Sequence, residues 1–177
     1  MNIIIHPKIA MFKRQGFLGS FNFKDFAKEK YYRKDIPNGE EFLELVHPKK
    51  YINKIKRACF NKAHLAELDL TPETYEIACL GVGTVILASD KGDFALQNID
   101  GHHAGRETAM GFNLFNATAI AAQRLINQNK KVAIIDIDGH HGNGTQDIFY
   151  NTNKVLYCSI HQQRAFPAIA FDKIVIS

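Results

Sequence analysis

The residues with the clearest chemical potential are Asp136-Ile137-Asp138-Gly139-His140, which follow an apolar run. Alternate side chains of an extended strand share one face, so two carboxylates and an imidazole converge on one side of the chain. The stretch lies at the carboxyl end of a predicted strand, where open α/β sheets place their sites. Asp and His in this arrangement suit Zn²⁺ or another divalent transition metal, because buried carboxylates need a compensating cation. The alternative is a polar strand end whose hydrogen bonds are satisfied locally.

A second candidate is the histidine pair His102-His103, which is flanked by Gly101 and by Ala104-Gly105. Adjacent histidines in a loop between a strand and a helix can both face one cleft. Histidine titrates near neutrality, so such a pair can move protons onto and off a metal-bound water. Taken alone, the pair favours a surface or capping role. Beside a metal-binding strand it becomes a candidate acid–base pair.

The elements that must position these residues follow from the hydrophobic pattern. Helices are expected over residues 48–59, from the cap at Thr71-Pro72 to about Ser89, and along one face from Phe112 to Ile126. Short strands are expected at the N-terminus, at 93–97, at 131–138 and at 155–160, with the last three buried. Apolar strands separated by helices are typical of a parallel sheet covered on both faces. The predicted fold class is therefore α/β, a three-layer α/β/α sandwich with a mainly parallel sheet.

Composition limits the class of protein. The length of 177 residues suits a single domain over residues 1–177. No apolar stretch approaches the roughly 18 residues of a transmembrane helix, and the N-terminal apolar run is too short for a secretory signal. Cys59, Cys79 and Cys158 are odd in number and widely spaced, which fits a reducing cytosol. We therefore expect a cytoplasmic protein with no membrane partner.

Basic residues alternate with Phe and Tyr between Lys13 and Lys34. Such a segment could bind single-stranded nucleic acid through stacking and phosphate contacts. The other interpretation is a surface segment whose aromatic rings anchor it to the core while its lysines stay hydrated. No nucleic-acid motif accompanies the segment and the net charge of +4 is mild, so we do not expect a nucleic-acid partner.

Taken together, the two histidine motifs resemble the paired signatures of zinc-dependent deacetylases, the family of histone deacetylases, acetylpolyamine amidohydrolases and acetoin utilisation proteins. One motif runs from Gly101 to Asn116 and the other from Asp136 to Gln146, and residues 155–161 resemble the strand that follows. The resemblance covers about residues 45–167, while the first forty residues match poorly. It implies the N-terminal portion of an arginase/deacetylase-like fold.

The resemblance implies a zinc-dependent hydrolase of N-acyl amides, which acts on acetyl-lysine in proteins or on acetylated polyamines. Asp138 and His140 match two of the three protein ligands of Zn²⁺. His103 matches the general base that activates water, and His102 matches its electrostatic partner. The remaining matches hold the two histidines (Asp136 and Asn143) or line the acyl-lysine tunnel (Gly111 and Phe112).

Structural K⁺ is also implied by the resemblance alone. The matching positions of one potassium site are Asp136, Asp138, His140, Ser159 and Ile160, and those of a second, backbone-lined site are Phe149, Thr152 and Val155.

The sequence departs from the family in the rest of the active site. The family's third zinc ligand is a downstream Asp and its oxyanion-stabilising Tyr follows later, and the context of Asp172 does not fit the missing ligand. Asp100 stands where the family usually has Pro. One hypothesis is an active amidohydrolase completed by a partner chain, by oligomer contacts or by further residues. The alternative is a truncated, non-catalytic remnant that binds metal or ligand weakly, with self-association through an exposed sheet edge.

Overall fold

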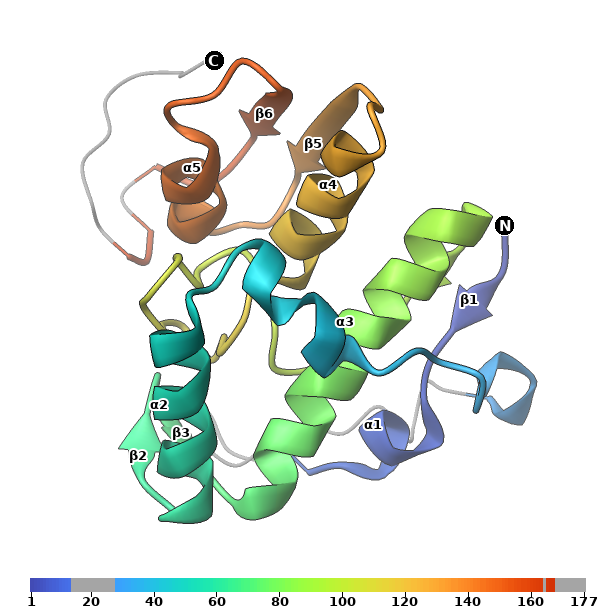
Figure 1. Cartoon of the computed structure of the whole chain (residues 1–177), viewed down its shortest axis with the longest axis vertical. Coiled ribbons are helices and arrows are strands. Elements are labelled where there is room, and N and C mark those ends of the chain that lie inside the picture. Colours follow the sequence, from blue (N-terminus) through green and yellow to red (C-terminus); the bar gives the residue numbers. More distant parts are fainter. Residues whose placement is uncertain (14–27, 164, 168–177) are drawn as a thin grey trace.

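The computed structural model describes residues 1–13, 28–163 and 165–167. The basic and aromatic segment therefore lies largely outside the described residues, as does Asp172. Along the chain the elements are β1 (Ile3–Ile4), α1 (Pro7–Met11), η2 (Glu29–Tyr31), η3 (Gly39–Leu45), α2 (Lys49–Phe60), β2 (His64–Leu65), β3 (Leu68–Asp69), α3 (Pro72–Lys91), β4 (Phe94–Ala95), α4 (Ala117–Asn127), β5 (Val132–Asp136), α5 (Asn143–Phe149) and β6 (Val155–Ser159). Figure 1 labels all of them except η2, η3 and β4.

The helix α3 lies at the centre of the hydrophobic core, with η3, α2 and α4 packed against it (Figure 1). It begins as predicted, because the Thr71 hydroxyl accepts a hydrogen bond from the Thr74 amide and Pro72 occupies the first turn. A Cβ at Gly83 would lie 2.9 Å from Cγ2 of Ile36 and would collide with the carbonyl of Pro37. Glycine within this helix therefore permits the close approach of the chain that leads into η3.

Two of the strand pairs are parallel. Strand β1 pairs with β4, and β5 pairs with β6 in a register that sets Val132 opposite Val155 and Asp136 opposite Ser159. The predicted pairing of the segments at 131–138 and 155–160 as parallel neighbours is confirmed. Helix α4 contacts β5 and α5 contacts β6, so helices support both strands that end near the predicted metal site.

The expected burial of these strands on both faces is wrong for the described part of the chain. Ile134 points into the core, whereas Ile135 is 71 % exposed, and Ile137 and Ile160 beyond the strand ends are 79 % and 73 % exposed. Phe94 in β4 is also 52 % exposed. A continuous apolar run predicts two-sided cover, but the described residues cover only the face of β5 and β6 that carries Ile134.

The helix predicted from Phe112 begins instead at Ala117. The side chain of Asn116 accepts a hydrogen bond from the Ala119 amide at 3.0 Å and caps the helix. Phe112 has a φ of 66°, which is incompatible with an α-helix. The apolar residues at 112 and 115 therefore belong to an irregular segment that leads into α4.

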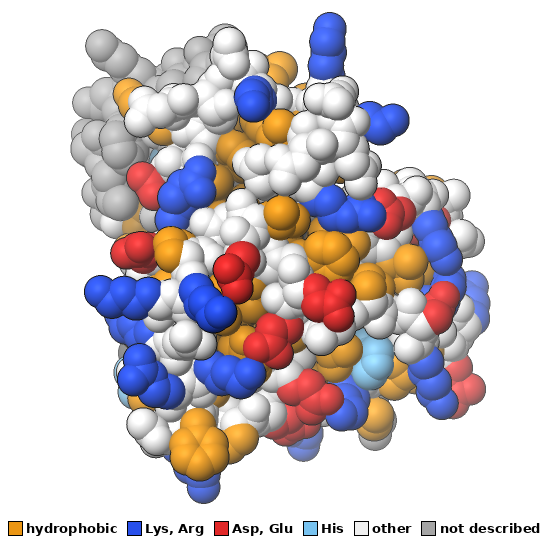
Figure 2. Space-filling model, in the orientation of Figure 1, with side chains coloured by type: hydrophobic (Ala, Val, Ile, Leu, Met, Phe, Trp, Pro, Cys, Tyr) orange, Lys and Arg blue, Asp and Glu red, His pale blue; other side chains and the backbone are white. Residues whose placement is uncertain are grey.

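Figure 2 shows basic side chains over α2, with acidic side chains interspersed on the same face. Lys56 of α2 pairs with Glu40 of η3 at 2.9 Å, and Arg124 of α4 pairs with Asp90 of α3 at 2.5 Å. These pairs join neighbouring elements at the surface. None of the helices in the described ranges is long and apolar enough to span a membrane.

Candidate active site

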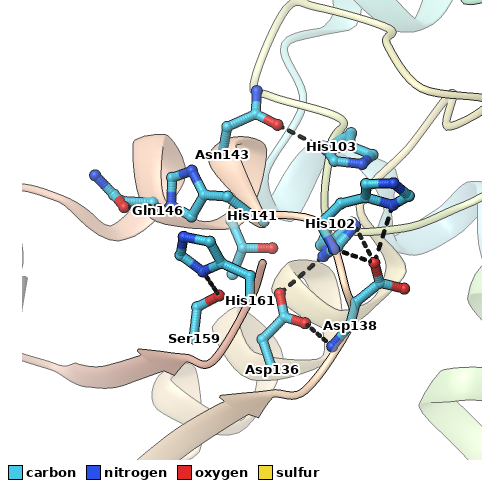
Figure 3. A network of polar contacts seen from close by, with 12 residues as sticks. His102, His103, Asp136, Asp138, His141, Asn143, Gln146, Ser159 and His161 are labelled. Atoms are coloured by element: carbon cyan, nitrogen blue, oxygen red, sulfur yellow. Dashed lines mark hydrogen bonds and ion pairs between the residues drawn. The ribbon is translucent and has the colours of Figure 1, made fainter. Parts of the chain in front are cut away.

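A cleft of about 890 Å³ lies at the carboxyl end of β5. Its lining includes four side chains from the two histidine motifs, namely His102, His103, Asp138 and His140. Figure 3 shows the two motifs facing one another across this site. Residues separated by more than thirty positions in the sequence therefore share one space, because the loop after β4 lies beside the end of β5.

His102 is held by the carboxylate of Asp136. Its Nδ1 donates a hydrogen bond to Asp136 Oδ2 at 2.8 Å (Figure 3). The same oxygen accepts a hydrogen bond from the Tyr157 hydroxyl at 2.9 Å, and Oδ1 accepts one from the Asp138 amide. Burial alone would raise the pKa of Asp136, but these donors, with His102 foremost, hold the pKa of the carboxyl below its ordinary value. Asp136 is therefore anionic and fixes the orientation of His102.

His103 is oriented by a neutral partner. Its Nδ1 lies 2.8 Å from Oδ1 of Asn143, and because an amide oxygen only accepts, Nδ1 carries the proton (Figure 3). The other ring nitrogen, Nε2, then keeps a lone pair. Burial lowers the pKa of His103, although the hydrogen bond to Asn143 opposes that shift. The ring is thus prepared to accept a proton near neutral pH.

Asp138 and His140 lie side by side at the open side of the cleft. Oδ1 of Asp138 is 3.2 Å from Nδ1 of His140, and both side chains are 53 % exposed. Ligand atoms at 2.0–2.1 Å from a tetrahedral Zn²⁺ lie roughly 3.3 Å apart, so the pair fits two corners of such a site. In the described ranges no group of three or more His, Cys, Asp and Glu side chains could hold a metal ion. The described residues therefore offer two adjacent side chains of the kind that bind a metal ion, without a third beside them.

Aromatic side chains form the walls of the cleft. Phe112 lines it beside Gly111, as the resemblance implied, and Phe166 packs edge-on against His103 with ring centroids 5.0 Å apart. The motifs gave no role to Phe166, to Tyr157 beneath Asp136 or to Glu67 at the rim. Their contacts with the site come from distant parts of the sequence, so the spacing within the motifs could not reveal them.

The positions matched to potassium lie partly outside the cleft. The Ser159 hydroxyl lies 2.8 Å from Nδ1 of His161, and the Asp136 carbonyl accepts a hydrogen bond from the Ile160 amide at 2.9 Å. These two positions flank the end of β5. The second set, which comprises Phe149, Thr152 and Val155, runs from the last residue of α5 to the first residue of β6 and does not line the cleft.

Gly144 allows α5 to approach the histidine loop. A Cβ at this position would lie 2.5 Å from the carbonyl carbon of Ala104 and 2.6 Å from that of His103, whereas a Cβ at Gly139 would meet nothing within 4 Å. We expect Gly144→Ala to lower the free energy of unfolding by about 1–3 kcal/mol through overpacking. The matched Gly139→Ala variant should change it much less. Urea denaturation of both variants checks this, and equal effects would contradict it.

Asp100 lies directly before the histidine loop and is only 3 % exposed. Neither of its carboxyl oxygens has a hydrogen-bond partner. Burial raises its pKa well above the ordinary value, and the nearby Phe115 amide offsets this only in part. Burial therefore favours the protonated form of this carboxyl in the folded protein more than in the unfolded chain.

Comparison with known proteins gives one consistent result. The profile of the histone deacetylase domain family matches residues 14–174. The match extends further towards both ends than the resemblance over residues 45–167. Histone deacetylase 18 of Arabidopsis thaliana is 37 % identical in an alignment over 144 residues that covers 70 % of this chain and 21 % of that protein.

Two further relatives agree with this match. The acetylpolyamine amidohydrolase of Mycoplana ramosa is 42 % identical over 60 % of this chain and 32 % of its own length. The crystal structure of a histone deacetylase homologue from Aquifex aeolicus superposes with a TM-score of 0.69 and 29 % identity, over 84 % of this chain and 44 % of that one. This similarity confirms the predicted fold class. The chain thus spans less than half the length of these relatives.

Proposed function

The chain belongs to the histone deacetylase domain family, and we propose that it carries the zinc-binding and proton-transfer residues of a metal-dependent N-acyl amide hydrolase. One observation carries the proposal. His102 and His103, each oriented through Nδ1 by Asp136 or Asn143, line the same cleft as the adjacent Asp138 and His140. Amide hydrolysis by an activated water requires a proton acceptor beside metal-binding side chains, and the cleft brings both kinds of group together.

In the proposed reaction His103 accepts the proton of the attacking water at Nε2. It then delivers this proton to the nitrogen of the leaving amine as the amide bond breaks. His102, backed by the Asp136 carboxylate, stabilises charge beside it. Asp138 and His140 would hold zinc, which supplies a Lewis acid for the amide carbonyl and lowers the pKa of the water. Phe112 and Phe166 would exclude bulk water from the acyl group.

Zinc binding tests this proposal directly. We expect Asp138→Asn and His140→Gln each to weaken the affinity of the purified chain for Zn²⁺ at least about tenfold, because each removes one of two adjacent ligands. Isothermal titration with Zn²⁺ measures the change. His64→Gln is the control, since His64 lies in β2 and pairs with Asp69 outside the cleft. Unchanged affinity in both site variants would refute the metal assignment.

The proposal extends to substrate and setting. Relatives named as histone deacetylases and as an acetylpolyamine amidohydrolase support an acylated amine as substrate, either acetyl-lysine in a protein or an acetylated polyamine.

We also propose structural K⁺ at the matched positions near Ser159. A cytoplasmic location is supported by the free thiols of Cys59, Cys79 and Cys158.

A second candidate function is metal or ligand binding without catalysis. It is favoured by the finding that the cleft, as far as the chain is described, offers two adjacent zinc ligands and no cluster of three. Turnover by the purified chain separates the two candidates. Zinc binding that depends on Asp138 but produces no hydrolysis would support this second function.

A further inference from the structure

The hairpin of β2 and β3 turns through two residues in an unusual conformation. His64 pairs with Asp69 and Leu65 with Leu68, which leaves Ala66 and Glu67 as the turn. Their φ angles are 53° and 61°, so both lie in the left-handed region. Hairpin turns of this kind ordinarily use Asn-Gly or a similar pair, because other residues are strained there. Strain of this kind persists where the surroundings hold it in place.

The surroundings in this case are the loop that forms one wall of the cleft. Oε2 of Glu67 accepts a hydrogen bond from the Gly111 amide at 2.9 Å, and the Ala66 carbonyl accepts one from the Phe112 amide at 3.0 Å. Gly111 and Phe112 also have positive φ angles, of 58° and 66°. The strained turn and the strained loop are thus joined by hydrogen bonds at both residues of the loop.

This loop lies directly against the proposed base. A Cβ at Gly111 would come within 2.5 Å of Cδ2 of His103 and 3.0 Å of Cε1 of Phe166. A small displacement of the loop would therefore change the space between Phe112, His103 and Phe166. The hairpin itself is anchored to the hydrophobic core by Leu68, which is only 2 % exposed.

We infer that Glu67 is a positioning residue, which holds the Gly111–Phe112 wall against His103 and so sets the width of the slot for the acyl group. The inference rests on the proposed function in taking that slot as the site of an acyl amide. The Ala66 carbonyl would bind Phe112 whatever side chain stood at 67, so the carboxylate is the part that the sequence specifies. A charged acceptor also makes the stronger hydrogen bond.

A fluorescent probe at the wall tests the inference without turnover. The sequence has no tryptophan, so Phe112→Trp gives emission from this position alone. We expect Glu67→Ala to increase acrylamide quenching of that emission. Glu67→Gln should restore most of the original value, because its amide oxygen also accepts from Gly111, although more weakly than a carboxylate. Glu107→Ala removes an exposed carboxylate from the loop between His103 and Gly111, away from the hairpin, and should leave quenching unchanged. Equal quenching in the Glu67→Ala and parent proteins would overturn the inference.

The second arm measures binding of a neutral acyl amide, N-butylacetamide, by NMR titration of the protein without the probe. Glu67→Ala should weaken binding about tenfold, the scale of one charge-assisted hydrogen bond, and Glu67→Gln should restore most of the affinity. Unchanged affinity in Glu67→Ala, or equal losses in both variants, would count against Glu67. Absence of binding by the wild-type chain would instead count against the proposed function, and the quenching arm would then decide the role of Glu67.

Discussion

Purified chain supplied with Zn²⁺ is expected to hydrolyse N-acetylputrescine at least about 10²–10³-fold more slowly than the acetylpolyamine amidohydrolase of Mycoplana ramosa. A catalytic zinc normally keeps three protein ligands and one open position. The described residues of the cleft offer Asp138 and His140 as adjacent ligands, and no tyrosine is among them to donate to the oxyanion. Loss of one such donor accounts for the stated factor, and a loosely held metal would add to it.

The measurement uses N-acetylputrescine and an acetyl-lysine peptide, with and without Zn²⁺. Asp138→Ala and His103→Ala serve as controls, because each removes a group that the reaction needs. Robust hydrolysis by the wild-type chain that disappears in both variants would contradict the prediction. It would mean that the site is completed by groups other than the described residues of one chain, such as those of a second copy.

The sequence predicted well those elements whose signals are local. Helix α3 begins at its Thr71-Pro72 cap, and α2 covers nearly the predicted range. Helix α4 was placed too early, because an apolar face continued through Phe112, whereas the Asn116 cap decides the actual start. Capping chemistry was thus a better guide to helix boundaries than periodicity, which cannot distinguish a packed loop from a helix.

Burial of the strands was harder to predict. The apolar run of β5 predicts cover on both faces, yet Ile135 is 71 % exposed while its neighbour Ile134 is 9 % exposed. An apolar sequence shows that both faces of a strand can be buried, but whether each face is buried depends on which other segments pack against it. The described residues supply such segments for one face alone.

The candidate site was predictable where it lies within the motifs. Strand alternation and the location of sites at strand ends identified Asp136, Asp138 and His140, and the resemblance paired Asn143 with His103. Glu67 and Phe166 could not be found in this way, because their positions depend on how the β2–β3 turn and the segment after β6 fold back onto the cleft. A left-handed turn without glycine has no clear sequence signal.

In the wild-type protein the free energy of unfolding is expected to fall as the pH rises, because of the buried Asp100 carboxyl. The Asp100→Asn variant is expected to lack this part of the pH dependence. The folded protein keeps the proton on Asp100 to a higher pH than the unfolded chain, which releases it above the ordinary pKa of 3.8. The folded state therefore binds more protons, so the free energy of unfolding falls with increasing pH. The penalty is absent below that pKa and grows by about 1.4 kcal/mol per pH unit until the pH reaches the folded pKa.

Urea denaturation of wild type and Asp100→Asn at pH 4, 6 and 8 measures the effect. The variant should gain on the wild type as the pH rises, because asparagine is neutral throughout. Asp147→Asn, which removes an exposed carboxylate from α5, controls for the loss of one charge. A difference between wild type and Asp100→Asn that stays constant from pH 4 to 8 would show that the carboxyl has a partner when folded. Because Asp100 precedes His102 by two residues, a gain with pH would also place this pH-dependent penalty directly beside the histidine loop.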